Sequence, residues 1–434
     1  MKTKKQKISN GMKEVINFLI AVSKLKTEPR SGWVLAEVKN PETIAEHTFR
    51  VAIASWLFAE KRKLNVKRAI MIALFHDICE VYAGDITPFI YYPNLPRDKE
   101  KRKKMLMKWA RLSKNEKQKR GQMKFEKEKK GLLKLIKSLS PDLKNEIFSM
   151  WVDYEKGISK EGRFVNQLNR IETLLQSITY FGTKNITKRT NWWEWTEEIV
   201  DDPLLLDFLK VIHKKLYGES MKDYEMNKEL ENILDFLLEI GKLKEMSRLY
   251  WKLRKVKNPE TVASHMFDLA LMTWAFNKEK SLNTEKLLKM ALCHEMSAVY
   301  TGDTTPYDRI MPKNKKEKEE VLKRWSRITK DKKKKIFLSD YKEEKEAIKR
   351  LTKKLDPQLR NEMIQLWREY RTKSTPEGYL LSQLNVLAVL IQALLYEKID
   401  KNCSAAPIWE WAFEACDNKE CFDFLEGLKK KFYK

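Results

Sequence analysis

Residues 39–49 read KNPETIAEHTF, and residues 257–267 repeat this pattern as KNPETVASHMF. A second pair follows at the same separation, with ALFHDICEVYAGDITP at 73–88 and ALCHEMSAVYTGDTTP at 291–306. Matched motifs this long, in the same order and at one spacing, are typical of an internal duplication. One unit of roughly 200 residues therefore occurs twice in the chain.

The later parts of the two units match as well, with PDLKNEIFSMWVDY at 141–154 and PQLRNEMIQLWREY at 357–370. The units join near residues 217–227, in a polar stretch that contains a glycine. We expect two domains, at residues 8–217 and 227–434.

The lysine-rich N-terminus and the apolar residues after it resemble a signal peptide. The same apolar stretch recurs in mid-chain, however, as LDFLLEIGKLK at 234–244. We therefore expect it to be the first helix of the unit rather than a secretory signal.

The composition favours helices. Gly and Pro number 13 each among 434 residues, and neither occurs between Glu42 and Phe75. Apolar side chains recur there at helical spacing, which predicts two helices broken near Leu64 and Asn65, with Thr43 close to the start of the first. Because no alternating strand pattern occurs, we expect an all-α fold of two tandem helical units.

The formal net charge is +26, a balance that attracts polyanions or phosphate-bearing ligands. The charge-rich segments 97–130 and 313–349 are interpreted as long, solvated helices. They contain little aromatic interleaving and no recognised base-reading motif, so we expect any nucleic-acid binding to be weak and non-specific. The alternative is a lysine-rich surface with no polyanionic partner, which the even spread of lysines favours.

Cysteine usage and hydropathy bear on the compartment. The five cysteines are odd in number and include no CxxC pair, which favours a reducing cytoplasm. No apolar run approaches the ~20 residues needed to span a bilayer, so we expect no membrane association.

Four of the five histidines fall at matching places in the two units, as His47 and His76, then His265 and His294. A lone histidine is usually a satisfied core or surface residue. Paired histidines in two copies of one motif indicate a shared role instead.

In the first unit, Asp77 follows His76 directly, and Glu80 lies four residues after the histidine. The spacing predicts that His76 and Glu80 lie on one face of one helix. Imidazole nitrogens with a carboxylate oxygen suit a divalent cation such as Zn, Mn, Co, Ni or Fe. Three protein ligands would leave a position open for water, and Glu80 beside them could take or give a proton.

These motifs resemble the HD-domain metal-dependent phosphohydrolases and, more narrowly, their 5′-deoxynucleotidase branch. The resemblance rests on RSGWVLAEVKNPETIAEHTFRVA at 30–52, HDICEVYAGDITP at 76–88 and EGRFVNQLNRIETLLQ at 161–176. It covers nearly the whole first unit. It implies a divalent-metal enzyme that removes phosphate from deoxynucleoside 5′-monophosphates.

The resemblance also implies roles for single residues. Those roles are metal ligation for His47, His76 and Asp77, catalysis for Glu80 and Asp85, and nucleotide binding for Arg30 and Trp33. The fork of donors on an arginine suits phosphate on physical grounds alone.

One position departs from the family pattern. Where the family has a fourth ligand, an Asp in a string like QLD, this chain has QLN, which ends in Asn169. An amide oxygen can coordinate a cation but brings no charge, so we expect weaker metal binding. Glu172, one turn later, is a candidate substitute ligand. The alternative is a metal-free pocket in which Asn169 only forms hydrogen bonds.

The second unit departs further. Glu295 stands in place of the aspartate, Ala298 in place of Glu80, and Ala388 in place of Glu172. We expect a degenerate site, weak or inactive in catalysis, that consists of His265, His294, Glu295, Asp303 and Asn385.

Two hypotheses follow. The first is a metal-dependent phosphohydrolase acting on nucleoside 5′-monophosphates, deoxynucleotides above all. The second is a non-catalytic HD protein that binds nucleotide or nucleic acid as a sensor or scaffold, which Asn169 and Asn385 favour. Because family members are often homodimers, we expect either an internal pseudo-dimer of the two units or a homodimer.

Overall fold

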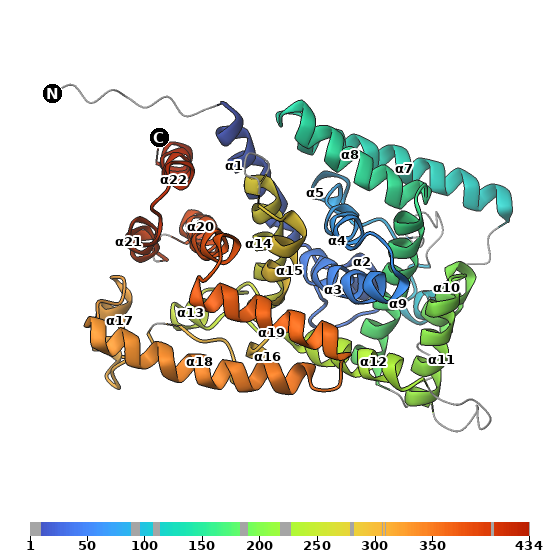
Figure 1. Cartoon of the computed structure of the whole chain (residues 1–434). Coiled ribbons are helices and arrows are strands. Elements are labelled where there is room, and N and C mark those ends of the chain that lie inside the picture. The colour runs from blue at the N-terminus through green and yellow to red at the C-terminus, as the bar shows by residue number, and fades with distance from the viewer. Residues whose placement is uncertain are drawn as a thin grey trace.

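The computed structural model describes residues 10–87, 96–106, 113–182, 190–217, 227–277, 282–305, 307–308, 310–400 and 403–433 (Figure 1). Within these residues the regular elements are helices and none is a β-strand, so the all-α prediction is confirmed. The predicted junction between the units, at 217–227, lies almost wholly outside the described residues, and the two domain limits stay predictions.

The first unit contains eleven α-helices and a short 3₁₀ turn among its described residues. They are α1 (Asn10–Val22), η1 (Ser23–Lys26), α2 (Ser31–Leu35), α3 (Ile44–Arg62), α4 (Val66–Phe75), α5 (Glu80–Ala83), α6 (Lys99–Leu106), α7 (Lys114–Ile136), α8 (Pro141–Lys156), α9 (Lys160–Phe181), α10 (Thr190–Ile199) and α11 (Pro203–Tyr217).

The described part of the second unit repeats this order. Its elements are α12 (Lys228–Gly241), η3 (Lys242–Lys244), α13 (Leu249–Leu253), α14 (Val262–Phe276), α15 (Thr284–Cys293), α16 (Ala298–Thr301), α17 (Lys315–Leu322), α18 (Lys330–Thr352), α19 (Pro357–Thr372), α20 (Pro376–Ile399), α21 (Ala406–Ala415) and α22 (Lys419–Phe432).

Local signals explain the two helices that carry the site. Thr43 caps α3 by accepting a hydrogen bond from the N–H of Glu46, whose side chain bonds back to the N–H of Thr43. The helix ends at Arg62, and the next residue, Lys63, caps it in the left-handed conformation with φ 56°. Asn65 then caps α4. The predicted pair of helices and the break between them are confirmed.

The prediction that His76 and Glu80 share one helix is wrong. Helix α4 ends at Phe75, residues 76–79 form a turn, and α5 begins at Glu80. The N–H of Glu80 donates to the carbonyl of Asp77 at 3.0 Å, a contact three residues apart rather than four. The backbone therefore tightens between the two helices, and the spacing of the side chains alone does not reveal this.

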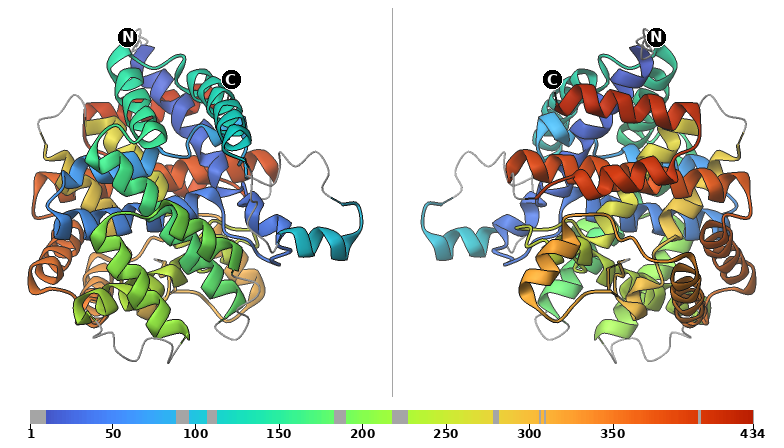
Figure 2. Two further views of the ribbon diagram at one scale, coloured as in Figure 1. Left: turned by 90° about the vertical axis from the view of Figure 1, so that its right-hand side faces the viewer. Right: turned by 90° about the vertical axis from the view of Figure 1, so that its left-hand side faces the viewer.

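The two units pack against each other. Helix α3 lies along α14, and α1 lies against α14 and α22. Trp274 of α14 reaches into the first unit, where its ring packs 4.8 Å from that of Phe75 and its N–H donates to Glu146 at 2.9 Å. One continuous hydrophobic core runs through both units. Figure 2 shows the joined body, with α6 standing away from it.

Helix α20 is long and apolar enough to cross a membrane, contrary to the expectation that no segment is. Of its most apolar 18-residue window, 83% is buried inside the protein. It crosses the second unit between α14 and α19. Its composition is therefore that of a central core helix.

In the described part of the charge-rich segment 97–130 most side chains are exposed, as predicted, although Glu128 is buried. Beyond that segment, the end of α7 buries Leu132, Leu135 and Ile136. Gly131 in the same stretch lies against α5, where an added Cβ would come within 2.8 Å of the Cys79 carbonyl oxygen and 3.0 Å of the Ala83 nitrogen. Glycine is required here because two backbones meet.

We expect Gly131→Ala to lower the free energy of unfolding by about 1–3 kcal/mol, because the methyl group forces α7 away from α5. Gly121→Ala in the same helix is the matched control, since its Cβ meets nothing within 4 Å. It should stabilise the protein by up to about 1 kcal/mol through helix propensity. Urea denaturation measures both, and equal effects would contradict the close approach.

Candidate active site

Three predicted ligands of the first unit come together. His47 lies on α3, while His76 and Asp77 begin the turn after α4. The Asp77 carboxylate lies 2.9 Å from Nε2 of His76 and 4.0 Å from Nε2 of His47. One ligand atom from each residue lies within 4.8 Å of the other two, which is close enough to hold a single ion.

Both histidines are buried, and hydrogen bonds orient both rings. Nδ1 of His76 donates to the Ala73 carbonyl at 2.6 Å. Nδ1 of His47 is hydrogen bonded to the Glu172 carboxylate. Each Nδ1 thus carries the proton, and each Nε2 presents a lone pair toward the site. Nε2 of His47 has no hydrogen-bond partner among the described residues, and Nε2 of His76 faces the Asp77 carboxylate at 2.9 Å without the geometry of a hydrogen bond.

Asn169 of α9, the predicted fourth ligand, lines the same cavity as Asp77. Its amide N–H donates to the hydroxyl of Tyr154, whose ring packs 5.0 Å from that of His76. This contact fixes the direction of the amide, and its buried Oδ1 has no hydrogen-bond partner among the described residues.

The donor set fits a divalent transition metal. Two imidazole nitrogens, a carboxylate and an amide oxygen are ligands that such ions accept, and three of these atoms are buried without a hydrogen-bond partner in the described part of the chain. Burial lowers the pKa of His47, which keeps the ring neutral. For Asp77, burial raises the pKa, but His76, Arg30 and His47 outweigh it and lower the pKa, so the carboxylate is charged.

Glu172, the candidate substitute ligand, does not join the other ligand atoms. It bonds the opposite nitrogen of His47 and receives the Nε–H of Arg50 at 2.8 Å. Glu42 lies near it, and these two acids with His47 could also hold an ion. The ammonium of Lys244 already contacts both carboxylates, however.

The two predicted catalytic acids differ in their surroundings. Glu80 is buried with its Oε2 unpartnered among the described residues. Burial raises its pKa well above the usual range, and the charges of Asp77 and Asp85 raise it further. Asp85 accepts the N–H of Ser31 at 2.6 Å and therefore holds the start of α2.

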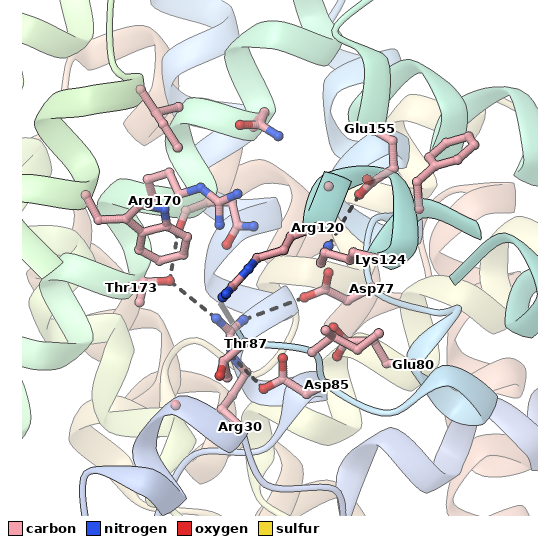
Figure 3. Close-up of a pocket in the computed structure, with 18 of the residues that line it drawn as sticks. Arg30, Asp77, Glu80, Asp85, Thr87, Arg120, Lys124, Glu155, Arg170 and Thr173 are labelled. Atoms are coloured by element: carbon pink, nitrogen blue, oxygen red, sulfur yellow. Dashed lines mark hydrogen bonds and ion pairs between the residues drawn. The ribbon is translucent and has the colours of Figure 1, made fainter. Parts of the chain in front are cut away.

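Arg30 lies where α2 begins, at the floor of a cavity of about 840 Å³ (Figure 3). Its guanidinium faces Asp77 at 3.6 Å, Asp85 at 3.9 Å and the Thr173 hydroxyl at 3.5 Å. All three distances are long for direct hydrogen bonds, so the donors of Arg30 are not tightly held.

Trp33 lines the same cavity but is only 1% exposed. Its N–H donates to Glu42 at 2.8 Å, and its ring stacks on Trp192 at 5.1 Å. Trp192 and Trp195 also line the cavity, and the guanidinium of Arg170 lies 4.0 Å above the ring of Trp195. Trp33 therefore packs behind Trp192 and exposes little of its own ring to the cavity.

Sequence reasoning missed the contribution of α7. Lys117, Arg120 and Lys124 of this helix line the cavity. Their spacing of three and four residues places them on one helix face, which is the signal that could have identified them. Lys124 contacts Glu128 at 2.9 Å and Glu155 at 3.9 Å.

In the second unit His265, His294 and Glu295 also lie close enough together to hold an ion, but their hydrogen bonds differ from those of the first unit. Nε2 of His265 is hydrogen bonded to Oδ1 of Asn385 at 2.8 Å, so this nitrogen carries the proton. Glu295 pairs with Arg248 and lies 3.7 Å from Nε2 of His294. Asp303 holds the N–H of Leu249 at 2.6 Å, as Asp85 holds that of Ser31 in the first unit.

Aromatic side chains occupy the cavity's place in the second unit. Tyr250 stands where the first unit has Gly32, and Trp411 where it has Trp195. A chain of ring contacts joins them, from Tyr250 to Tyr307 at 5.7 Å, on to Trp325 at 5.8 Å, and to Trp411 at 4.6 Å. The space that is open in the first unit is therefore filled.

Comparison with curated proteins gives relatives named 5′-deoxynucleotidase HDDC2. That of Xenopus laevis is 32% identical over 172 residues, which is 40% of this chain and 72% of that protein. The human relative is 32% identical over 171 residues, which is 39% of this chain and 70% of that protein. The crystal structure of PH0347 protein from Pyrococcus horikoshii OT3 is 22% identical and covers 46% of this chain and 97% of that one, with a TM-score of 0.31.

The family pattern described as HD domain matches residues 22–199 and again residues 240–409. Both segments contain the paired histidines, and together they span most of the sequence. The chain therefore belongs to the HD domain family and carries the domain twice.

Proposed function

We propose that the first unit is a metal-dependent phosphohydrolase that removes phosphate from nucleoside 5′-monophosphates, with deoxynucleotides as its main substrates. One observation carries this proposal. A cluster of unpartnered ligand atoms, in the part of the chain that the structure describes, adjoins a cavity that Asp77 and Asn169 line together with a loosely held arginine, a buried acid and aromatic side chains. The names of the curated relatives support the same substrate class.

We assign the metal to His47, His76, Asp77 and Asn169. A divalent cation bound there would polarise a phosphoryl oxygen and make water a nucleophile near neutral pH. Mn, Co, Zn, Ni and Fe all suit this donor set. The chain's contribution is a fixed set of lone pairs in a buried pocket.

Arg30 binds the phosphate in this proposal. Its planar fork can turn from its long contacts with Asp77 and Asp85 to a phosphate in the cavity. Asp85 acts as a positioning residue, since its hydrogen bond to the N–H of Ser31 holds the backbone next to Arg30.

Glu80 supplies the proton. Its raised pKa keeps a buried carboxyl group protonated, so it can donate to the 5′ oxygen as that oxygen leaves phosphorus. The base and sugar would lie toward Trp192 and Trp195. The cavity volume of about 840 Å³ is within the usual range for small-molecule sites.

The second unit is proposed to be catalytically inactive. It has alanine at the position of Glu80, a filled cavity and a proton on the nitrogen that a metal would need. The non-catalytic hypothesis fits this unit and not the first. The units would form an internal pseudo-dimer in a cytoplasmic protein; a homodimer of whole chains and weak nucleic-acid binding stay predictions.

The decisive test is phosphate release from a panel of nucleoside and deoxynucleoside monophosphates, with Mn, Co, Zn or Ni added to metal-stripped protein. We expect the wild type to release phosphate, His76→Ala to release none, and His294→Ala to keep most of the wild-type activity. Metal content and thermal unfolding of each variant are the controls. Absence of release with every metal would contradict the proposal, and equal loss in both variants would contradict the inactivity of the second unit.

Asn169→Asp should tighten metal binding, because it adds a negative charge at the same ligand position. The Tyr154 hydroxyl can donate to the new carboxylate, so the side chain keeps its orientation. We expect at least a tenfold lower dissociation constant, measured by competition with a chromophoric chelator. Asn385→Asp, in the second unit, is the matched control and should leave the affinity of the first site unchanged.

Gly32→Tyr should close the cavity as Tyr250 does in the second unit. The atom nearest to an added Cβ at Gly32 is the Thr87 methyl carbon, at 4.0 Å, so the backbone can accept the side chain. We expect a rise in KM of tenfold or more with metal affinity unchanged. Gly32→Ala is the control; if both variants raise KM equally, the ring is not what blocks the substrate.

A further inference from the structure

Each unit places a buried lysine behind the paired histidines of the other. Lys244, from η3 of the second unit, contacts Glu42 and Glu172 of the first. Lys26, from η1 of the first unit, contacts Glu260 at 2.9 Å and Asp268 of the second at 2.5 Å. The lysine side chains are 2% and 3% exposed, so both cross the boundary between the units in the interior of the protein.

In the first unit this lysine is one contact away from a metal ligand. Lys244 bonds Glu172, and Glu172 bonds Nδ1 of His47. Lys244 also donates to Gln176 at 3.1 Å, and Arg50 donates to Glu172 at 2.8 Å. Two carboxylates and two cations therefore balance in a cluster with almost no exposed surface.

In the second unit the corresponding connection is absent from the described residues. Ala388 stands at the position of Glu172, and Asp268 at that of Arg50. Lys26 still balances two carboxylates, but alanine cannot bond the histidine as Glu172 does, and Nε2 of His265 carries the proton. Both units therefore have the buried lysine, but His47 carries its proton on Nδ1 and His265 carries it on Nε2. The difference follows from the carboxylate of Glu172, which the second unit lacks.

We propose that Lys244 is a positioning residue for the first unit's active site, supplied by the second unit. It draws the Glu42 and Glu172 carboxylates together and holds Glu172 against Nδ1 of His47, which leaves Nε2 free as a ligand. Without the ammonium, Glu172 would keep Arg50 as its cation and Glu42 would keep only the N–H of Trp33, and the two buried carboxylates would repel each other. The inactive unit is then a structural part of the active one.

Because the metal is itself part of the proposed function, the primary test uses metal-free, full-length protein. With ¹⁵N-labelled histidine, NMR distinguishes the two imidazole tautomers, and the His47 signals are assigned by their loss in His47→Gln. We expect the Nδ1–H form in the wild type and a substantial Nε2–H population in Lys244→Met.

Lys26→Met is the matched control, because it removes the same group from the symmetric position. It also leaves two buried carboxylates without their lysine, so the structural cost is comparable. We expect it to leave the His47 signals unchanged. If Lys244→Met does not fold, Lys244→Gln serves instead, with a smaller shift in the same direction. Unchanged His47 signals in a folded Lys244 variant would overturn the proposal.

Metal affinity gives a second readout, because the direction of its change in Lys244→Met distinguishes a positioning role from a simple charge effect. Loss of the orientation of His47 should weaken binding about 10–100-fold in Lys244→Met, as is usual for residues behind a ligand, and Lys26→Met should leave it unchanged. A lysine that acted only as a nearby positive charge would repel the cation, so unchanged or tighter binding also overturns the proposal. If the wild type neither binds metal nor releases phosphate, the proposed function fails, while the tautomers still decide the role of Lys244.

Discussion

The hydrogen bond between Glu172 and Nδ1 of His47 is the contact on which the first site depends. An imidazole can present only one lone pair, and a buried carboxylate on one nitrogen determines that the other is the ligand. Burying that carboxylate is costly unless cations surround it, which explains why Arg50 and a lysine from the other unit converge on it. The tautomer of His47 therefore depends on the buried carboxylate, the carboxylate depends on its cations, and one of these cations depends on the packing of the two units.

The contrast between the units follows from a few substitutions. Ala388 removes the carboxylate that would set the tautomer of His265, and Oδ1 of Asn385 instead accepts a hydrogen bond from the Nε2–H of this histidine. Tyr250 replaces a glycine and begins the line of rings that fills the cavity. The order of the elements that carry these changes is the same in both units, and Asp303 accepts the N–H at the start of α13 as Asp85 does at the start of α2. The two units therefore share a fold but differ in the residues that form their sites.

Much of the fold can be predicted from local signals. Thr43 caps the helix whose start it marks in the sequence, Asn65 lies at the predicted break, and the repeated histidine motifs by themselves single out His47 and His76. The turn at 76–79 escapes such a prediction because its side chains keep the spacing of a helix. The role of Lys244 escapes it because the partners of this lysine lie 72 and 202 residues away. Long-range electrostatics is the part that a pattern of residue types does not contain.

Because the two units share one core, the first site should stay complete when the protein is diluted. A site that takes a side chain from a separate subunit loses it when the protein concentration falls below the dissociation constant of the assembly. Here α3 and α14 belong to one chain, so their association is intramolecular and the effective concentration of one unit beside the other is set by the polypeptide. The completeness of this site should be independent of how much of the protein a cell makes.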